Sequence, residues 1–121
     1  MEQHHLVQKI AKVLYDKKAL DITALYVGDM TVITDYMVIA CGRSSLQTRA
    51  LAEEVDDAMA QEGVQLRAKE GMSEGRWIIL DFNHVLVHLF HPEERKHYNL
   101  ERLWADGQNS IDLPFIDDEE D

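Results

Sequence analysis

Several features that mark specialised classes of protein are scarce in this chain of 121 residues. It has one cysteine, Cys41, so an internal disulfide is excluded, and the apolar neighbours of Cys41 in "VIACG" indicate a buried strand end rather than a reactive thiol. No apolar run approaches the roughly 20 residues needed to cross a bilayer, and the N-terminus lacks a signal-peptide core. We therefore expect a cytoplasmic protein with no membrane partner.

Basic residues are also scarce, because 12 Lys and Arg stand against 23 Asp and Glu and give a net charge of −11. Seven of these carboxylates and no basic residue lie in residues 106–121, so residues 1–105 carry only −4. Binding to a phosphate backbone needs clustered Lys and Arg. We therefore expect no binding to DNA, and a basic protein rather than the RNA as the partner in any RNA-containing machine.

Length and composition predict one domain, since single cores usually span roughly 100 to 200 residues. The 45% apolar and 29% charged content is typical of a globular protein, and the chain has neither an internal repeat nor a low-complexity linker. We predict a single α/β domain over residues 1–105. Residues 106–121 are expected to form an acidic, disordered tail.

The spacing of apolar residues predicts the order αββαβββ followed by short C-terminal helices. The helix at 44–63 has the clearest ends, because Ser44 and Gln47 stand in capping-box spacing and Gly63 suits a helix stop. This order predicts a small α/β sandwich of two or three layers with an edge strand at 64–69. The predicted helices are 6–18, 44–63, 92–97 and 100–104, and the predicted strands are 21–27, 36–42, 64–69, 76–82 and 85–90.

The stretch "RWIILDFNHVLVHLF" predicts a β-hairpin with two different faces. With Asn83 and His84 as a two-residue turn, Phe82 pairs with Val85, and opposed residues share a face of the sheet. One face is wholly apolar and is expected in the core: Ile78, Leu80, Phe82, Val85, Val87 and Leu89. The other face, called here the mixed face, consists of Trp77, Ile79, Asp81, Leu86, His88 and Phe90.

The mixed face allows two interpretations. Burying Asp81 and His88 without partners would cost several kcal/mol, which favours an exposed surface where Trp77 anchors a partner protein. Alternatively, the first helix covers this face, Trp77 lies at the edge of the core, and the two polar residues are paired locally. The pattern alone does not choose between these interpretations.

The sequence alone specifies no reaction. The six histidines match no zinc spacing, and helix capping accounts for Ser44 and its neighbour in the absence of a nucleophile elbow. "CGRSS" is similar to the phosphate-holding turn of nucleotidyltransferases, whose chemistry needs two or three carboxylates around magnesium. Asp81 with Asp35 or Glu70 is the enzymatic alternative, although we expect Asp35 to cap a turn. We predict no catalytic residue, no metal and no cofactor.

Several motifs occur along the chain in a combination that is specific. They are "TDYMVIACG" (34–42), the Ser-Ser-x-Gln helix start, Glu70-Gly71, "WIILD" (77–81), "VLVHLF" (85–90) and the R-x-x-Y-x-L-E-x-L-W pattern (95–104). On these motifs, from about Leu6 to Ala105, the chain resembles the ribosomal silencing factor family, RsfS, also called Iojap-like. It departs from the family at the hairpin turn, where the usual Gly-Asp is Asn83-His84 here.

This resemblance implies a nucleotidyltransferase-like fold with a mixed sheet of about five strands and without the catalytic carboxylates. It also implies binding to the fourteenth protein of the large ribosomal subunit, which blocks joining of the small subunit and lowers translation when nutrients are short. Organellar relatives imply a role in assembly of the large subunit as the alternative. The free protein is expected to be a monomer or a weak homodimer.

The resemblance favours an exposed mixed face. It implies that Trp77 is the anchor for the partner, and that nearby carboxylates pair with Lys and Arg of a basic ribosomal protein. The other partner-binding residues that it implies are Asp81, His88, Glu70, Arg95 and Tyr98.

Overall fold

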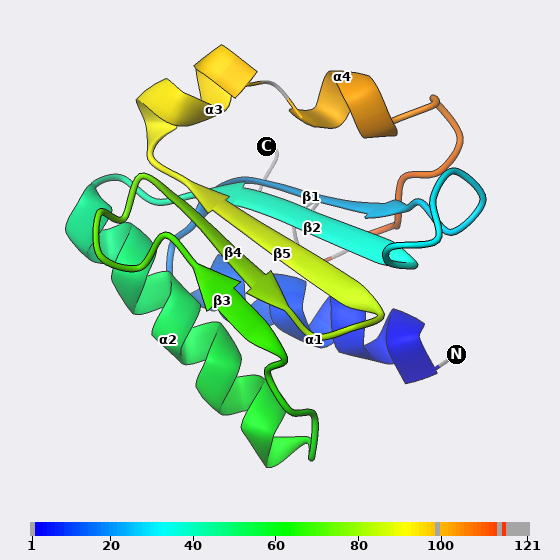
Figure 1. Ribbon diagram of the computed structural model, residues 1–121, viewed down its shortest axis with the longest axis horizontal. Coiled ribbons are helices and arrows are strands. Elements are labelled where there is room, and N and C mark those ends of the chain that lie inside the picture. Colours follow the sequence, from blue (N-terminus) through cyan, green and yellow to red (C-terminus); the bar gives the residue numbers. More distant parts are fainter. Residues whose placement is uncertain (1, 99, 114, 116–121) are drawn as a thin grey trace.

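The computed structural model describes residues 2–98, 100–113 and 115, and for residues 2, 3, 97, 98 and 101 it describes the backbone only. Within these residues, five strands form one mixed sheet in the order β1-β2-β5-β4-β3 (Figure 1). The strands are β1 (Leu20–Tyr26), β2 (Tyr36–Cys41), β3 (Ala68–Glu70), β4 (Trp77–Asp81) and β5 (Val85–Phe90). The helices are α1 (Glu2–Asp16), α2 (Ser45–Gln61), α3 (Pro92–Tyr98) and α4 (Leu100–Trp104). The predicted order of elements and the mixed α/β sheet are confirmed.

The helices lie in two layers on opposite faces of the sheet, with α1 and α2 on one face and α3 and α4 on the other (Figure 1). The larger core fills the space between the sheet and α1 and α2, because both helices direct an apolar stripe at it. The six hairpin residues predicted to be in the core are all buried, as expected. The architecture is therefore a three-layer sandwich with one thin layer.

Strands β2 and β5 are parallel neighbours at the centre of the sheet, and every other neighbouring pair is antiparallel. The register of the hairpin is the predicted one: Trp77 pairs with Phe90, and Asp81 pairs with Leu86. The turn closes where Phe82 N–H donates to the Val85 carbonyl at 3.0 Å. Asn83 takes the left-handed backbone conformation that a tight hairpin turn demands (φ 79°).

Helix α2 begins as its sequence predicts. The Ser44 hydroxyl accepts a hydrogen bond from Gln47 N–H at 3.1 Å, and the Gln47 side-chain oxygen accepts from Arg43 N–H at 2.6 Å. The first bond satisfies a backbone donor in the first turn of the helix. The second bond goes to the residue before the cap, whereas in a standard capping box it would go to the N–H of the cap residue itself. At the other end Gly63 has a φ of 79°, which suits the residue after a helix.

The predicted strand at 64–69 is wrong over most of its length. Only its last two residues belong to β3, which pairs with β4 from Ala68 to Glu70. Val64 and Leu66 are instead half-buried and pack against the larger core. The predicted alternation of half-buried and exposed side chains holds from Val64 to Arg67, but the backbone hydrogen bonds of Val64 and Arg67 go to Met59 of α2 and Asp81 of β4 without forming a regular strand.

The folded contacts extend past the predicted domain boundary at residue 105. Tyr26 N–H donates to the Asn109 carbonyl at 2.9 Å, and Ile111 N–H donates to the Ala24 carbonyl at 2.8 Å, so this segment runs along the outer edge of β1. Leu113 is buried in the larger core. The expectation of a tail separate from the domain is therefore wrong for 109–113, and residues 116–121 lie outside the described part of the chain.

The cap of α2 gives a test of local stability. Replacing Ser44 by Ala removes the acceptor for Gln47 N–H, and we expect the free energy of unfolding to fall by about 1 kcal/mol. Urea denaturation measures this. Ser45→Ala is the matched control, since Ser45 is the first residue inside the helix; equal losses in the two variants would contradict the capping role.

Candidate functional site

Trp77, Leu86 and Phe90 of the mixed face share a hydrophobic cluster with residues of α4. The mixed face therefore lies on the side of the sheet that carries α3 and α4, whose position Figure 1 shows. Helix α1 packs on the opposite face, so the expectation that the first helix covers the mixed face is wrong. The rest of that alternative is confirmed, because Trp77 packs at the edge of the smaller core and His88 and Asp81 have local hydrogen-bond partners. A smaller core forms under the short helices, where Phe90 is fully buried and Leu100 and Trp104 pack against it. Residues beyond the hairpin therefore cover part of the face.

Burial divides the mixed face in two. His88 (7% exposed) and Phe90 (0%) are buried, so the expectation of a fully exposed face is wrong at these positions. Glu70 belongs to the same face because it pairs with Ile79 across β3 and β4, and it is exposed. The residues that stay wholly or partly accessible are called here the open sheet face: Glu70, Trp77, Ile79, Asp81 and Leu86.

Trp77 sits on a layer of aromatic rings. Its indole Nε1–H donates to His88 Nδ1 at 3.1 Å, and its ring stacks on Phe90 with centroids 5.0 Å apart. The His88 and Phe90 rings are nearly parallel, with 12° between their planes. The contacts with His88 and Phe90 therefore hold the indole in one orientation, and the ring stays partly accessible. A fixed orientation of this kind lowers the entropy that an aromatic side chain loses when it binds a partner.

His88 is hydrogen-bonded to Trp77 and is shielded from solvent. Because Nδ1 accepts the indole proton, the neutral ring carries its own proton on Nε2. That nitrogen is buried, and among the described residues it has no hydrogen-bond partner. Burial lowers the pKa of His88 from 6.5 to about 4, so the ring is neutral at neutral pH. The predicted contact residue is thus a positioning residue for Trp77.

Arg95 is not brought to the open sheet face. Its guanidinium donates to the Asp21 carbonyl at 2.6 Å and lies 3.4 Å from Thr23 Oγ1 and 3.6 Å from Cys41 Sγ. These contacts tie α3 to β1 and β2, on the far side of β5 from Trp77. The side chain of Tyr98, the other predicted residue of this segment, lies outside the described residues.

Two residues that support the face had no assigned role in the sequence reading. A Cβ on Gly71 would lie 2.0 Å from the Trp77 carbonyl oxygen. The φ of Gly71 is 84°, which residues other than glycine rarely adopt, so only glycine fits between β3 and β4. Arg76, next to Trp77, pairs with Glu94 of α3 at 2.7 Å, and this hydrogen bond raises the pKa of Arg76. The Glu70-Gly71 motif in the sequence was a signal for the role of Gly71. No local pattern in the sequence indicates the role of Arg76.

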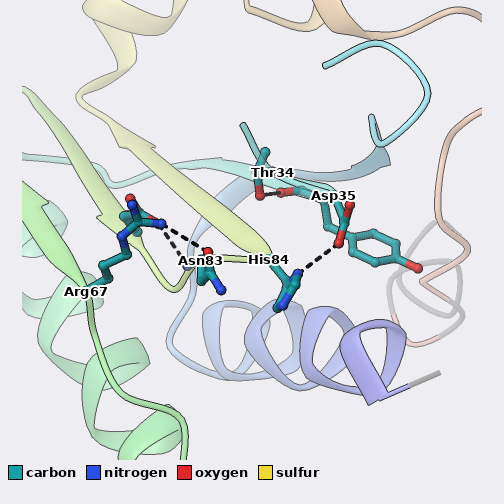
Figure 2. Close-up of polar contacts among 7 residues, drawn as sticks. Thr34, Asp35, Arg67, Asn83 and His84 are labelled. Atoms are coloured by element: carbon teal, nitrogen blue, oxygen red, sulfur yellow. Dashed lines mark hydrogen bonds and ion pairs between the residues drawn. The ribbon is translucent and has the colours of Figure 1, made fainter. Parts of the chain in front are cut away.

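Two of the three carboxylates considered for catalysis, Asp81 and Asp35, have structural partners, and the third, Glu70, is exposed. Asp81 accepts from Asn83 N–H at 2.8 Å within the turn. The Asp35 carboxylate is hydrogen-bonded to His84 Nδ1 at 2.9 Å, across to the hairpin turn (Figure 2), rather than capping its own turn as expected. Among residues 2–98, 100–113 and 115, no group of three His, Cys, Asp or Glu side chains is arranged to hold a metal ion. None of the described helices is long and apolar enough to span a membrane.

Comparisons with known proteins agree on one family. The family model "Ribosomal silencing factor during starvation" matches residues 1–121. The chain is 40% identical over 115 residues to a Bacillus subtilis protein named ribosomal silencing factor RsfS, covering 95% of this chain and 97% of that one. It is 35% identical over 109 residues to the chloroplastic protein Iojap of Arabidopsis thaliana, covering 90% of this chain and 45% of that one. A crystal structure from Bacillus halodurans superposes with a TM-score of 0.78 at 33% identity, covering 90% and 98% of the two chains.

The buried histidine predicts a dependence of stability on pH. The pKa of His88 is lower in the folded state (about 4) than the 6.5 of an exposed histidine, so the unfolded chain binds the proton first and stability falls as pH drops from about 6.5 to 4. The loss attributable to His88 is up to about 3 kcal/mol at 1.36 kcal/mol per pKa unit. Urea denaturation of the native chain and of His88→Gln, whose amide oxygen can accept from Trp77, measures the difference across this pH range. A native-state NMR titration of His88 near pH 6.5 would contradict the assignment.

Proposed function

This chain belongs to the ribosomal silencing factor family, and from that membership we propose that it binds the large ribosomal subunit through the fourteenth protein of that subunit. Bound there, it occupies the surface that the small subunit would contact. It thereby blocks joining of the subunits and represses translation under nutrient limitation or in stationary phase. The site of action is the cytoplasm, with neither DNA nor a membrane as partner.

The observation that carries this proposal is the composition of the open sheet face. Trp77 offers a partly exposed aromatic ring held in place by His88 and Phe90, and Glu70 and Asp81 on the same face are negatively charged. Aromatic anchors supply much of the energy of protein interfaces, while complementary charges set orientation and the association rate. Ribosomal proteins are basic, so such a face suits one of them better than it suits ribosomal RNA.

The proposed mechanism is steric and involves no chemical step. A protein interface of ordinary size buries roughly 800 Å² on each partner, so the contact must include loops around the open sheet face. Repression then requires only that the bound domain overlaps the position of the small subunit. Of the carboxylates that an enzyme would need, Asp81 is engaged in the hairpin turn and Asp35 in the contact with His84, which supports a protein without turnover.

A role in assembly of the large subunit is the second candidate, favoured by the similarity to the chloroplastic Iojap protein. It uses the same surface but acts on immature particles. Ribosome profiles of a deletion strain separate the two roles. Accumulation of precursor subunits favours assembly, whereas normal subunits with excess joined ribosomes in starved cells favour silencing.

Charge reversal on the open sheet face tests the proposal. Glu70→Lys should weaken binding to purified large subunits at least about tenfold, which equals 1.4 kcal/mol, because a lysine would face Lys and Arg of the partner. Sucrose-gradient sedimentation with separated subunits measures both the binding and the yield of joined ribosomes. Glu70 is exposed on a short edge strand, so this change leaves the core intact.

Asp57→Lys is the matched control, since it makes the same change in charge on the exposed side of α2, in the opposite layer. Trp77→Ala should also abolish binding. Because Trp77 contacts His88 and Phe90, the thermal unfolding of this variant must be measured as well, to show that it remains folded. If the native chain stays at the top of the gradient at low salt, the ribosomal proposal fails. Equal weakening by Glu70→Lys and Asp57→Lys would show an unspecific charge effect.

A further inference from the structure

The loop between β1 and β2 exposes an unusual amount of apolar surface. Val32 is fully exposed, Ile33 is 71% exposed and Met30 is 43% exposed. Three large apolar side chains directed into solvent from one short segment are costly unless another surface covers them in the working protein. The loop tip is defined here as these three residues.

The loop is firmly held at its base. Val27 N–H donates to the Asp35 carbonyl at 2.8 Å, which closes the loop, and Met30 N–H returns to the Val27 carbonyl at 2.9 Å. The Asp35 carboxylate pairs with His84 at 2.9 Å, and its backbone N–H donates to the His84 carbonyl at 3.1 Å. Figure 2 shows this connection between the loop and the hairpin turn. The tip is therefore presented by a fixed backbone, which lowers the entropy lost on binding.

The surroundings of the tip are negatively charged. Asp29 and Asp35 lie in the loop, and no Lys or Arg occurs between Lys18 and Arg43 in the sequence. The pKa of Tyr26 is raised, mainly by the charge of Asp29, then by burial and by Asp35, as expected where the local potential is negative. An apolar tip between carboxylates fits an apolar recess rimmed by Lys or Arg.

The loop continues the open sheet face. It leads into β2 at Tyr36, which pairs with Val85 at the start of β5, and Leu86 next along β5 pairs with Asp81. The loop thus leaves the end of the sheet where Asp81 and Leu86 lie. Figure 1 shows it rising from that end on the side that carries α4, the side of the open sheet face. One partner can contact both surfaces.

We propose that the loop tip is a second anchor for the same basic ribosomal protein, in which Met30, Val32 and Ile33 enter an apolar recess bordered by Lys and Arg. This inference rests on the proposed function. A second copy of the chain suits the tip less well, because two copies would bring the carboxylates of both loops together. The open sheet face and the loop tip then act as two points of one interface, which fixes the orientation of the bound domain.

The double variant Val32→Ser/Ile33→Ser tests this proposal on the full chain. Both side chains are exposed, so its urea midpoint should match that of the native chain, while its affinity for large subunits should fall at least tenfold in sedimentation binding assays. Leu46→Ser is the matched control, because Leu46 is 73% exposed at the start of α2, in the opposite layer. It should bind as the native chain does.

The outcomes separate this inference from the proposed function. If the native chain does not bind large subunits, the proposed function fails and the inference fails with it. If the native chain and the double variant bind equally well, the proposed function stands and the loop anchor is overturned. Sedimentation velocity of the free proteins adds a third outcome: a native dimer that the double variant converts to monomer, with unchanged binding to the subunit, would assign the tip to self-association and also overturn the proposal.

Discussion

The parallel pairing of β2 with β5 is the constraint on which the rest of the fold depends. It joins the β1-β2 half of the sheet to the β3-β4-β5 half, with six consecutive residue pairs from Tyr36 with Val85 to Cys41 with Phe90. A parallel pair requires a long connection and layers on both faces. Helices α1 and α2 supply one layer, and the other must come from the short helices after β5. The burial of Phe90 follows directly from that requirement.

The parts of the fold that could be predicted from sequence are those set by neighbours along the chain. The hairpin register follows from a two-residue turn at Asn83, and the start of α2 follows from Ser44 and Gln47. The position of α3 could not be predicted, because it depends on contacts such as Arg95 with the Asp21 carbonyl, 74 residues away. The pairing of residues 109–113 with β1 could not be predicted for the same reason. These residues lie in an acidic stretch whose composition is typical of a disordered tail, and only the folded chain brings them to the edge of the sheet.

In the candidate site, too, the features set by neighbouring residues could be predicted, and those set by distant segments could not. Strand alternation was enough to put Trp77 and Asp81 on one face, because side-chain parity is a local property. Glu70 was indicated only by the resemblance, and the pairing of β3 with β4 shows that it shares that face. Strand alternation could not distinguish the buried His88 from its exposed neighbours, since that depends on which later segment covers which strand. The loop tip carries no motif of its own. Its apolar residues resemble ordinary strand residues until the backbone shows that they face solvent.

The segment at 109–113 has a further consequence for how this sheet behaves in solution. Strand β1 would otherwise present unpaired backbone groups along one border of the sheet, and such a border can recruit strands from other molecules. The chain's own C-terminal segment occupies part of that border through Asn109 and Ile111. The opposite border is β3, only three residues long and bearing Lys69 and Glu70. Both borders of the sheet therefore resist the addition of strands from other molecules and so disfavour fibre growth.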